Sequence, residues 1–425
     1  MIIGNGAAAI HAIMALRESG CDETIHLYSD TTWPPYNPTL TTYFIAGKIP
    51  LENCFPFGTG LAFYQRYGVY AHLGSPVVEV DAARQEIRTG NGVRQRYSRC
   101  LVASGASPYL PPVCGIKGEG VYTMRTLEDA LRLKQALKDN PRRALVVGAS
   151  MVGIKLVEAF YEAGIEVCLA DLAPQVFPLA AHPECARLIE GYLEGKGIKL
   201  LLGAGIAGIE PSRHGLKAYF NGGKTAEVAD LVVIAIGVRP NLGFLSPDQV
   251  AIAKGLLVDD HMRTSVPNLY AAGDVAQGNN LQTGEKELIG LWANARYQGR
   301  TAGRNMAGIE DVYPGSIPHN ITHFLDMTFI SIGDVRRGER EEKIHRDGGY
   351  LQLIWDGDRL QGLNLLNYYR GAGIWKQALL NQALGVGDGR CHGVIPGLID
   401  RAPIYANFNT LLEYPAPLRF LLKNG

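Results

Sequence analysis

The sequence predicts an α/β protein in which two Rossmann-like dinucleotide-binding domains are followed by a smaller α+β interface domain. Two segments run in the order strand, glycine-rich turn, helix and strand, one beginning near residue 2 and the other near residue 144. After about residue 310 the pattern changes to short strands with alternating apolar residues. A chain of 425 residues is long enough for roughly two to four domains of ordinary size.

The first unit opens the chain. A short apolar strand leads into G-N-G-A-A-A, apolar residues then recur at helical spacing, and a second strand ends at Asp30. In such a G-x-G-x-x-A turn, Gly4 makes the bend, Gly6 lets the backbone approach a pyrophosphate at the helix N-terminus, and the small Ala9 permits close packing on the strand. Asp30, about 20 residues further on, is the candidate for binding a ribose hydroxyl. An ordinary glycine turn in an α/β domain is the alternative.

The second unit repeats this order. Gly148 and Gly153 occupy the first and third glycine positions, while Ser150 replaces the middle glycine, where its Cβ would crowd a pyrophosphate slightly. Asp171 ends the next strand, and its carboxylate would accept bonds from a ribose 2′-hydroxyl but repel a 2′-phosphate. This unit therefore predicts NAD rather than NADP. Two such units in one chain suggest that one nucleotide is a bound flavin and the other a diffusing nicotinamide.

Three further apolar segments end in small residues, as strands that approach a ligand do. They are residues 99–105, 231–236 and 269–275. In the last of them Gly273 would allow close approach to a ligand, and Asp274 could bond a polyol hydroxyl. A helix N-cap is the alternative for Asp274, because aspartate is a preferred residue there.

The C-terminal part is predicted to be a separate α+β module. Strands are expected at residues 328–333, 351–355 and 360–365, with a hairpin turn at 356–358 between the last two. A helix is expected at about residues 374–383.

Composition excludes several other classes of protein. Lysine and arginine together number 41, as do aspartate and glutamate, so no net charge favours nucleic acid or a membrane surface. The apolar run 231–236 is far shorter than the roughly 20 residues that a membrane span needs. The chain opens directly on a strand, so we expect no signal peptide and a cytoplasmic protein.

The cysteines predict no disulfide, metal or iron–sulfur site within this chain. Their number is odd, and no two are spaced as in a C-x-x-C or C-x-x-x-x-C motif. We therefore expect reduced thiols that take no part in turnover. The seven are Cys21, Cys54, Cys100, Cys114, Cys168, Cys185 and Cys391.

Eight stretches, in order over the first 305 residues, carry a specific resemblance to a known family. They are IIGNGAAA (2–9), PPYNPTLTTYFIAGK (34–48), LVASGASPYLPP (101–112), GVYTMRTLEDA (120–130), VVGASMVGIK (146–155), AIGVRPN (235–241), LYAAGDVA (269–276) and LWANARYQGRTAGRN (291–305). On these stretches the chain resembles the pyridine nucleotide–disulfide oxidoreductase superfamily, in its ferredoxin- and rubredoxin-reductase-like branch. The resemblance implies an FAD domain (residues 1–110 and 240–310), an inserted NAD domain (111–239) and a C-terminal interface domain similar to a dimerisation domain (311–425).

The resemblance also implies which residues bind the two cofactors, FAD and NAD. For FAD they are Gly4, Gly6, Ala9, Asp30, Ala103, Gly105, Arg125, Gly273, Asp274 and Trp292. For NAD they are Gly148, Ser150, Gly153, Asp171 and Gly237. The family's acidic residue aligns either with Asp30 or with Thr31, where this chain has no acid.

Two positions depart from the family pattern, and they are our candidates for catalytic positions. Where peroxidase, oxidase and coenzyme A-disulfide reductase members have a cysteine and ferredoxin-reductase-like members a lysine, this chain has Thr42. Where the family has a glutamate paired with that lysine near the flavin, this chain has Lys155. The charge pattern is thus altered or inverted, and a lysine facing the flavin would stabilise its anionic reduced form and raise its potential. A lysine turned to solvent is the alternative.

Without a cysteine relay, electrons must pass to an outside carrier, and an iron–sulfur protein or subunit is the expected partner. The first hypothesis is an FAD-dependent NAD(H) oxidoreductase that forms part of a hetero-oligomer. It would be similar to the flavin subunit of multi-subunit 2-oxoacid dehydrogenases of the phenylglyoxylate:NAD oxidoreductase type. One alternative is a stand-alone NADH:rubredoxin or ferredoxin reductase. Another, motivated by Ser150 and Lys155, is an FAD-holding scaffold subunit without hydride transfer.

Overall fold

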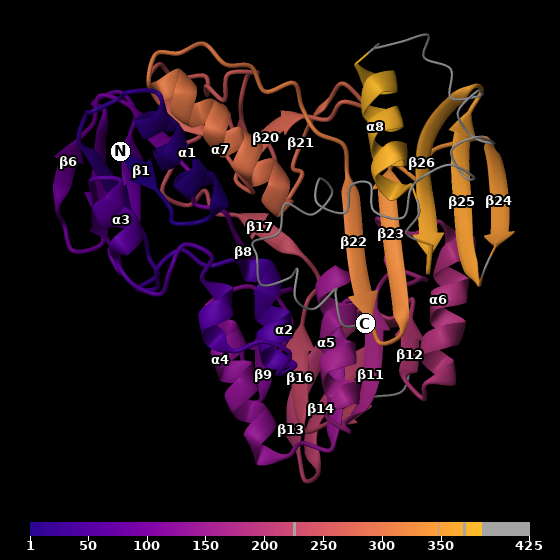
Figure 1. Ribbon diagram of the computed structural model, residues 1–425. Helices are drawn as coiled ribbons and strands as arrows, with labels where there is room; N and C mark the ends of the chain where they lie inside the picture. Colours follow the sequence, from indigo (N-terminus) through magenta and orange to yellow (C-terminus); the bar gives the residue numbers. More distant parts are fainter. Residues whose placement is uncertain (224–226, 347, 369–370, 385–425) are drawn as a thin grey trace. The chain divides into compact units, whose positions relative to one another are not determined.

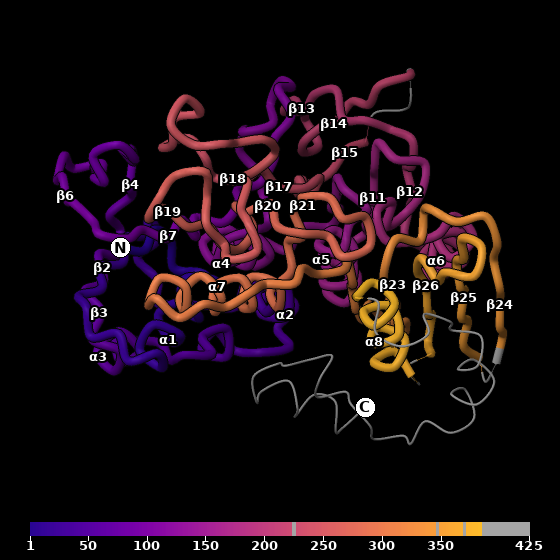
Figure 2. The backbone as a smooth tube through the Cα atoms, turned by 90° about the horizontal axis from the view of Figure 1, so that it is seen from above, coloured from indigo at the N-terminus to yellow at the C-terminus, as the bar shows by residue number. Residues whose placement is uncertain are grey.

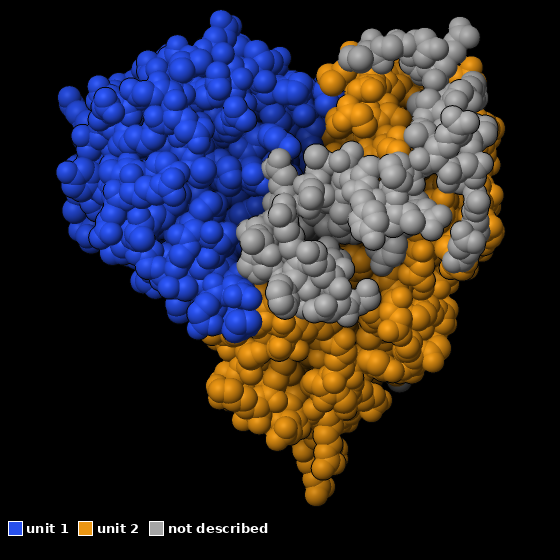
Figure 3. All heavy atoms as spheres, viewed as in Figure 1, with its two compact units in different colours: residues 1–40, 50–107, 238–316 blue, residues 41–49, 108–237, 317–425 orange. Residues whose placement is uncertain are grey.

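The computed structural model describes residues 1–223, 227–346, 348–368 and 371–384. The chain divides into two compact units (Figure 3). Unit 1 comprises residues 1–40, 50–107 and 238–316, and unit 2 comprises residues 41–49, 108–237 and 317–425. Each unit contains a five-stranded parallel sheet, and unit 2 has an additional five-stranded antiparallel sheet from the C-terminal part of the chain. The expected α/β fold with two Rossmann-like domains and a C-terminal α+β module is therefore confirmed.

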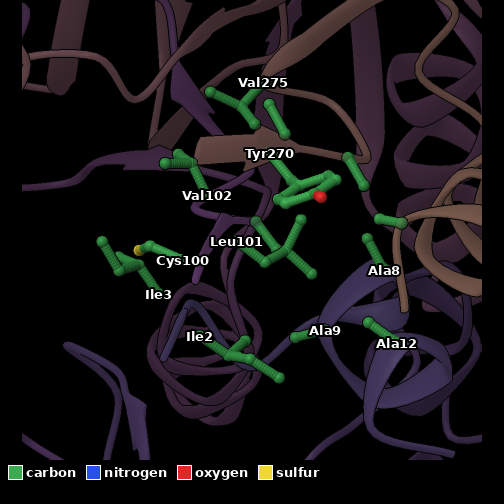
Figure 4. Close-up of a cluster of buried hydrophobic side chains, with 14 of the residues drawn as sticks. Ile2, Ile3, Ala8, Ala9, Ala12, Cys100, Leu101, Val102, Tyr270 and Val275 are labelled. Atoms are coloured by element: carbon green, nitrogen blue, oxygen red, sulfur yellow. The ribbon is translucent and has the colours of Figure 1, made fainter. Parts of the chain in front are cut away.

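The parallel sheet of unit 1 has β1 at its centre. Figure 1 labels β1 beside the N-terminus of the chain. Its strands in order are β19 (Leu269–Ala271), β7 (Cys100–Val102), β1 (Ile2–Ile3), β2 (Ile25–Tyr28) and β3 (Val69–His72). Figure 4 shows side chains of this core, among them Ile2 of β1 and Leu101 of β7, which are fully buried. Helix α1 (Ala7–Glu18) contributes Ala9 and Ala12 to the same cluster.

Helices α1 and α7 (Trp292–Met306) pack at very short range because glycines of α7 face the backbone of α1. A Cβ at Gly299 would lie 2.2 Å from the carbonyl oxygen of Ala8, and one at Gly303 would lie 2.5 Å from that of Ala12. Neither glycine can carry a side chain without pushing the helices apart. This packing fixes the N-terminal half of α1, which follows the first glycine-rich turn.

Smaller elements complete unit 1, and Figure 2 shows several of them from above. One antiparallel sheet consists of β4 (Val77–Asp81), β5 (Glu86–Thr89) and β6 (Arg94–Arg96). Another sheet consists of β18 (Leu256–Leu257), β20 (Ala276–Asn279) and β21 (Lys286–Glu287). Helix α3 (Ala62–Arg66) precedes β3, and β8 (Ala106–Pro108) pairs with β17 (Val238–Pro240).

The parallel sheet of unit 2 has β10 at its centre. Its strands in order are β12 (Lys199–Leu202), β11 (Glu166–Asp171), β10 (Arg143–Val147), β16 (Leu231–Ile234) and β9 (Val121–Thr123). Its helices are α2 (Thr41–Ile45), α4 (Leu127–Ala136), α5 (Met151–Glu162) and α6 (Pro183–Gly195). A separate antiparallel sheet consists of β13 (Ile206–Ser212), β14 (Gly215–Phe220) and β15 (Glu227–Ala229).

The antiparallel sheet at the C-terminal end of unit 2 matches the predicted module. Its strands in order are β22 (His319–Phe324), β23 (Met327–Gly333), β26 (Arg359–Leu366), β25 (Gly349–Asp356) and β24 (Arg340–Arg346), and helix α8 spans Ala372–Ala383. The three predicted strands and the helix are present, and the hairpin at residues 356–358 joins β25 to β26. Strands β22 and β24 were not predicted, because their polar residues hide the apolar alternation.

Helix α8 is joined to β22 by a hydrogen bond that needs a neutral imidazole. Lys376 Nζ lies 3.3 Å from His319 Nε2, and His319 Nδ1 lies 3.0 Å from the carbonyl oxygen of Ile317. Burial, together with the charge of Lys376, lowers the pKa of His319 from 6.5 to about 4. The imidazole therefore accepts through Nε2 and donates through Nδ1.

We expect acid to destabilise unit 2 through His319. The unfolded chain takes up this proton near pH 6.5, whereas the folded protein does so only near pH 4. Stability is therefore fully present above pH 6.5 and is lost as the pH falls toward 4, with a cost of about 2 kcal/mol between pH 7 and pH 5. Urea unfolding at both pH values should show a weaker pH dependence for His319→Gln. The same dependence in variant and wild type would show that His319 is not responsible.

Candidate dinucleotide sites

The first glycine-rich turn joins β1 to the N-terminus of α1. Gly4 has a φ of +111°, and a Cβ there would lie 2.1 Å from the carbonyl oxygen of Ala103, so another residue fits only if the backbone moves. Gly6 is the N-cap of α1 with a φ of −89°, and a Cβ there would meet no protein atom within 4 Å. The turn thus leaves open space beside the first amides of α1, where a dinucleotide pyrophosphate fits.

Asn5, between the two glycines, holds this turn and was missed in the sequence. Its Nδ2 donates to the carbonyl oxygen of Trp33 (3.1 Å), and its Oδ1 accepts from the hydroxyl of Tyr64 (2.9 Å). Burial raises the pKa of Tyr64 to about 12, so the hydroxyl stays protonated as a donor. The partners lie 28 and 59 residues away, so short-range patterns carry no signal for them.

A distant segment of the proposed FAD site reaches the same helix. Gly273 has a φ of +82°, its amide donates to Gln298 Oε1 (2.8 Å), and a Cβ on it would lie 3.2 Å from the Cβ of Ala8. Asp274 is half-buried and is followed by strand β20 rather than by a helix, so the N-cap alternative for Asp274 is wrong. The structure thus brings Gly273, the residue before Asp274, to the N-terminal half of α1.

The remaining residues proposed for FAD differ in position. Ala103 is buried, and Gly105 follows it with a φ of +66°. Asp30 is exposed just beyond β2, and Trp292 is the half-buried first residue of α7. Arg125 belongs to unit 2, where its amide donates to the carboxylate that closes the capping box of α4. Their contacts with FAD stay predictions.

The second turn, between β10 and α5, has the same backbone arrangement as the first. Gly148 has a φ of +117°, and a Cβ there would lie 2.3 Å from the carbonyl oxygen of Ala235. A Cβ at Gly153 would lie 1.8 Å from the carbonyl oxygen of Gly148, so the helix rests directly on the turn. Ser150 is the N-cap of α5: its Oγ accepts from the amide of Gly153 (3.4 Å) and donates to Ala235 (3.1 Å). The serine therefore has a structural role, which its N-cap position could have signalled.

The side chain of Asp171, at the end of β11, is hydrogen-bonded to this turn. Asp171 Oδ2 accepts from the amide of Ala149 (2.6 Å), and its Oδ1 accepts from the amide of Ala173 (2.7 Å). The side chain is half-buried and so stays near the turn, where a ribose would approach. Gly237 has a φ of +119° and open space around its Cα. The arrangement of both turns fits dinucleotides, with the carboxylate of Asp171 available for ribose hydroxyls of the second.

Lys155 lies on the second turn of α5 and is only 9% exposed, so the solvent-facing alternative is wrong. Its ammonium forms an ion pair with Glu158 and donates to the carbonyl oxygen of His323 (2.7 Å). It also lies 4.4 Å from the centroid of the Tyr43 ring. Burial lowers the pKa of Lys155, while Glu158 opposes that effect.

Glu158 also compensates the altered charge pattern. It accepts from Lys48 Nζ (2.7 Å), which in turn lies 2.9 Å from Glu162, and from the amide of Leu325 (3.1 Å). Two lysines thus face two glutamates within unit 2, so Lys155 does not stand there as an uncompensated charge. Thr42 is buried in α2, next to Tyr43. Sequence reasoning missed Lys48, because partners 110 residues apart leave no local pattern. It also missed Glu158, although its i,i+3 spacing from Lys155 was a local signal.

The described part of the chain contains neither a metal-binding cluster nor a membrane-spanning helix. No group of histidine, cysteine, aspartate and glutamate side chains in it could hold a metal ion. No helix within these residues is long and apolar enough to cross a membrane.

The described cysteines are mostly buried. Burial raises the pKa of Cys54 to about 11 and those of Cys100 and Cys168 to about 12, and it also raises that of Cys185. Cys114 is exposed and Cys21 is partly exposed. Cys391 lies outside the described residues.

We expect alkylation of the accessible thiols to leave reduction of the flavin by NADH unchanged. The thiolate is the reactive form, and buried thiols with a raised pKa are neutral at pH 7. Rapid-mixing measurement of flavin bleaching after iodoacetamide treatment tests this, with Cys114→Ser as the control for the exposed thiol. Stoichiometric loss of reduction on labelling one cysteine would overturn the expectation.

Known proteins are similar to this chain over most of its length, including both glycine-rich turns. Residues 1–299 match the family described as pyridine nucleotide-disulphide oxidoreductase. The chain is 32% identical over 389 residues to the NADH-dependent phenylglyoxylate dehydrogenase subunit epsilon of Aromatoleum evansii, covering 90% of this chain and 91% of the relative. It is 31% identical to the NADH oxidase of Methanocaldococcus jannaschii, covering 80% and 75%. The structure of the covalent putidaredoxin reductase–putidaredoxin complex matches with a TM-score of 0.82 and 25% identity, covering 89% of this chain and 92% of that one.

Proposed function

The chain belongs to the pyridine nucleotide-disulphide oxidoreductase family and is an FAD-dependent NAD(H) oxidoreductase, and we propose that it acts as the flavin subunit of a multi-subunit 2-oxoacid dehydrogenase. The missing cysteine relay carries this proposal: Thr42 stands where relatives with thiol chemistry have cysteine, and no C-x-x-C pair occurs. Electrons must then leave toward an outside carrier, and an iron–sulfur subunit suits a flavin that releases electrons singly. The 32% identical relative, a dehydrogenase subunit matched over 91% of its length, supports this role.

Each of the two glycine-rich turns would bind one of the two cofactors. When bound, FAD supplies hydride exchange with the nicotinamide and single-electron exchange with the carrier. The amides after Gly6 would hold the FAD pyrophosphate, and those after Gly148 would hold that of NAD. Asp171 would accept from the adenosine ribose. In this proposal another subunit oxidises the 2-oxoacid, and this chain delivers the electrons to NAD⁺.

Native mass measurement of the protein purified from its own cells tests the complex. We expect a constant assembly in which peptide identification finds iron–sulfur subunits beside this chain. A lone chain that reduces an added rubredoxin or ferredoxin with NADH at full rate would contradict the complex and establish the stand-alone reductase. The covalent reductase–carrier complex among the similar structures is the observation that favours this second candidate.

The scaffold alternative is decided by a separate measurement. A subunit that only holds FAD would keep its yellow colour when NADH is added under anaerobic conditions. We expect rapid bleaching instead, because Ser150 serves α5 as a helix cap and the ion pair with Glu158 compensates Lys155. A flavin that NADH fails to bleach would support the scaffold.

A further inference from the structure

We propose that Phe177 is a positioning residue for NAD(H), and that the C-terminal sheet sets the affinity for this nucleotide through it. The inference rests on the proposed assignment of the turn at residues 148–150 to NAD. The loop of residues 172–182 joins β11 to α6. It contacts the nucleotide turn on one side and the C-terminal sheet on the other, and all three belong to unit 2.

The loop and the strand before it hold both backbone polar groups of one residue, Ala149, in the nucleotide turn. The amide of Phe177 donates to the carbonyl oxygen of Ala149 (2.8 Å). The amide of Ala149 itself donates to Asp171 (2.6 Å). Ala149 lies between Gly148 and Ser150, so these two bonds fix how the turn presents its following amides to a pyrophosphate.

Phe177 makes its bond from a backbone conformation that its own side chain does not favour. Its φ is +47°, in the left-handed region where a bulky residue is strained. The ring is 2% exposed and stacks on Phe329 of β23, with centroids 4.8 Å apart and planes 14° apart. It also contacts Phe324 of β22 (5.9 Å, tilted by 59°). The C-terminal sheet therefore holds Phe177 in the conformation from which its amide reaches Ala149.

Hydrogen bonds attach the end of the same loop to the sheet. Asn364 of β26 is fully buried; its Nδ2 donates to the carbonyl oxygen of Ala180 (2.8 Å), and its Oδ1 accepts from the amide of His182 (2.7 Å). The His182 ring lies 2.8 Å from Gln352 of β25 and 3.2 Å from Glu341 of β24. The loop is therefore attached to the sheet at two separate places, and its position depends on that sheet.

A substitution in the sheet tests the idea without touching the turn or the loop. Phe329→Leu removes the stacked ring and leaves residues 148–150 and 172–182 intact. We expect the dissociation constant for NAD⁺, measured by titration calorimetry on the flavin-loaded protein, to rise about tenfold. The flavin content should not change, because the glycine turn and Gly273–Asp274 assigned to FAD lie in unit 1, and the substitution changes none of the residues assigned to FAD. At saturating NADH the rate of flavin reduction should also be close to that of the wild type, since the loss is one of binding.

Ile330→Ala is the matched control. Ile330 is the next residue of β23, points to the opposite face of the sheet and is 2% exposed, so its truncation also removes buried carbon from the same strand. It should lower the melting temperature without weakening NAD⁺ binding. Equal losses of affinity in Phe329→Leu and Ile330→Ala would mean general destabilisation and would overturn the proposal.

Phe177→Gly gives a second route if Phe329→Leu does not fold. Glycine adopts a φ of +47° without strain, so this variant removes the contact of the loop with Phe329 without adding backbone strain. It should give a similar loss of affinity, and the double variant should lose no more than either single one, because both remove the same contact. Unchanged NAD⁺ binding in the variants would contradict only the role of Phe177. A wild-type protein that binds no NAD⁺ would contradict both this role and the proposed function.

Discussion

Gly6→Val is expected to yield a folded protein that purifies without flavin. The φ of −89° and ψ of −171° at Gly6 suit valine, and no protein atom lies within 4 Å of the new Cβ, so the fold accepts the change. The added carbons instead occupy the space beside the first amides of α1, which the pyrophosphate of FAD would need. Measurement of the FAD-to-protein ratio, with circular dichroism as the check on folding, should show a nearly complete loss of flavin.

Substitutions at two other glycines serve as controls for Gly6→Val. Gly60→Val also places a side chain in open space, at an exposed position, and should keep its flavin. Gly4→Ala should fail to fold, because its Cβ would lie 2.1 Å from the carbonyl oxygen of Ala103. A Gly6→Val protein that retains full flavin would remove the first turn from the FAD site.

The parts of this protein that could be predicted from sequence depend on short-range geometry. A glycine with positive φ next to a helix start leaves a local signature, so Gly4 and Gly148 were found directly. The alternating residues and the turn of the β25–β26 hairpin are equally local. The strands that end near the turns were found too, although β7 and β19 are shorter than the predicted segments.

The parts that could not be predicted depend on residues that are distant in the chain. Lys48 reaches Glu158 from 110 residues away, whereas the pair of Glu158 with Lys155, at i,i+3 on one helix, did leave a local signal. The positive φ of Phe177 leaves no signal in the local sequence, because the stacked ring of Phe329, far along the chain, holds Phe177 in this conformation. Asp274 looked equally suited to a helix start, and only the pairing of the following strand decides against it.

Asp171→Ala is expected to reduce the preference for NADH over NADPH about 100-fold. A carboxylate about 4 Å from a phosphate charge, at the effective dielectric of a partly exposed site, repels it by up to about 4 kcal/mol, and solvent screening leaves about 2–3 kcal/mol of this. That energy corresponds to a factor of about 100 in relative affinity. The quantity to measure is the ratio of kcat/KM for NADH to kcat/KM for NADPH.

The NADH/NADPH ratio is the quantity to compare because Asp171 has two roles in this structure. Besides its charge, it accepts the amide of Ala149, so Asp171→Ala also loosens the turn and should weaken both nucleotides alike. Asp171→Asn separates the effects: its amide removes the charge, and its single oxygen can keep one of the two bonds to Ala149 and Ala173. We expect the asparagine variant to lose most of the NADH preference with a smaller loss of NADH efficiency. If both variants lose efficiency while the NADH/NADPH ratio stays at its wild-type value, Asp171 only anchors the turn and does not select NAD.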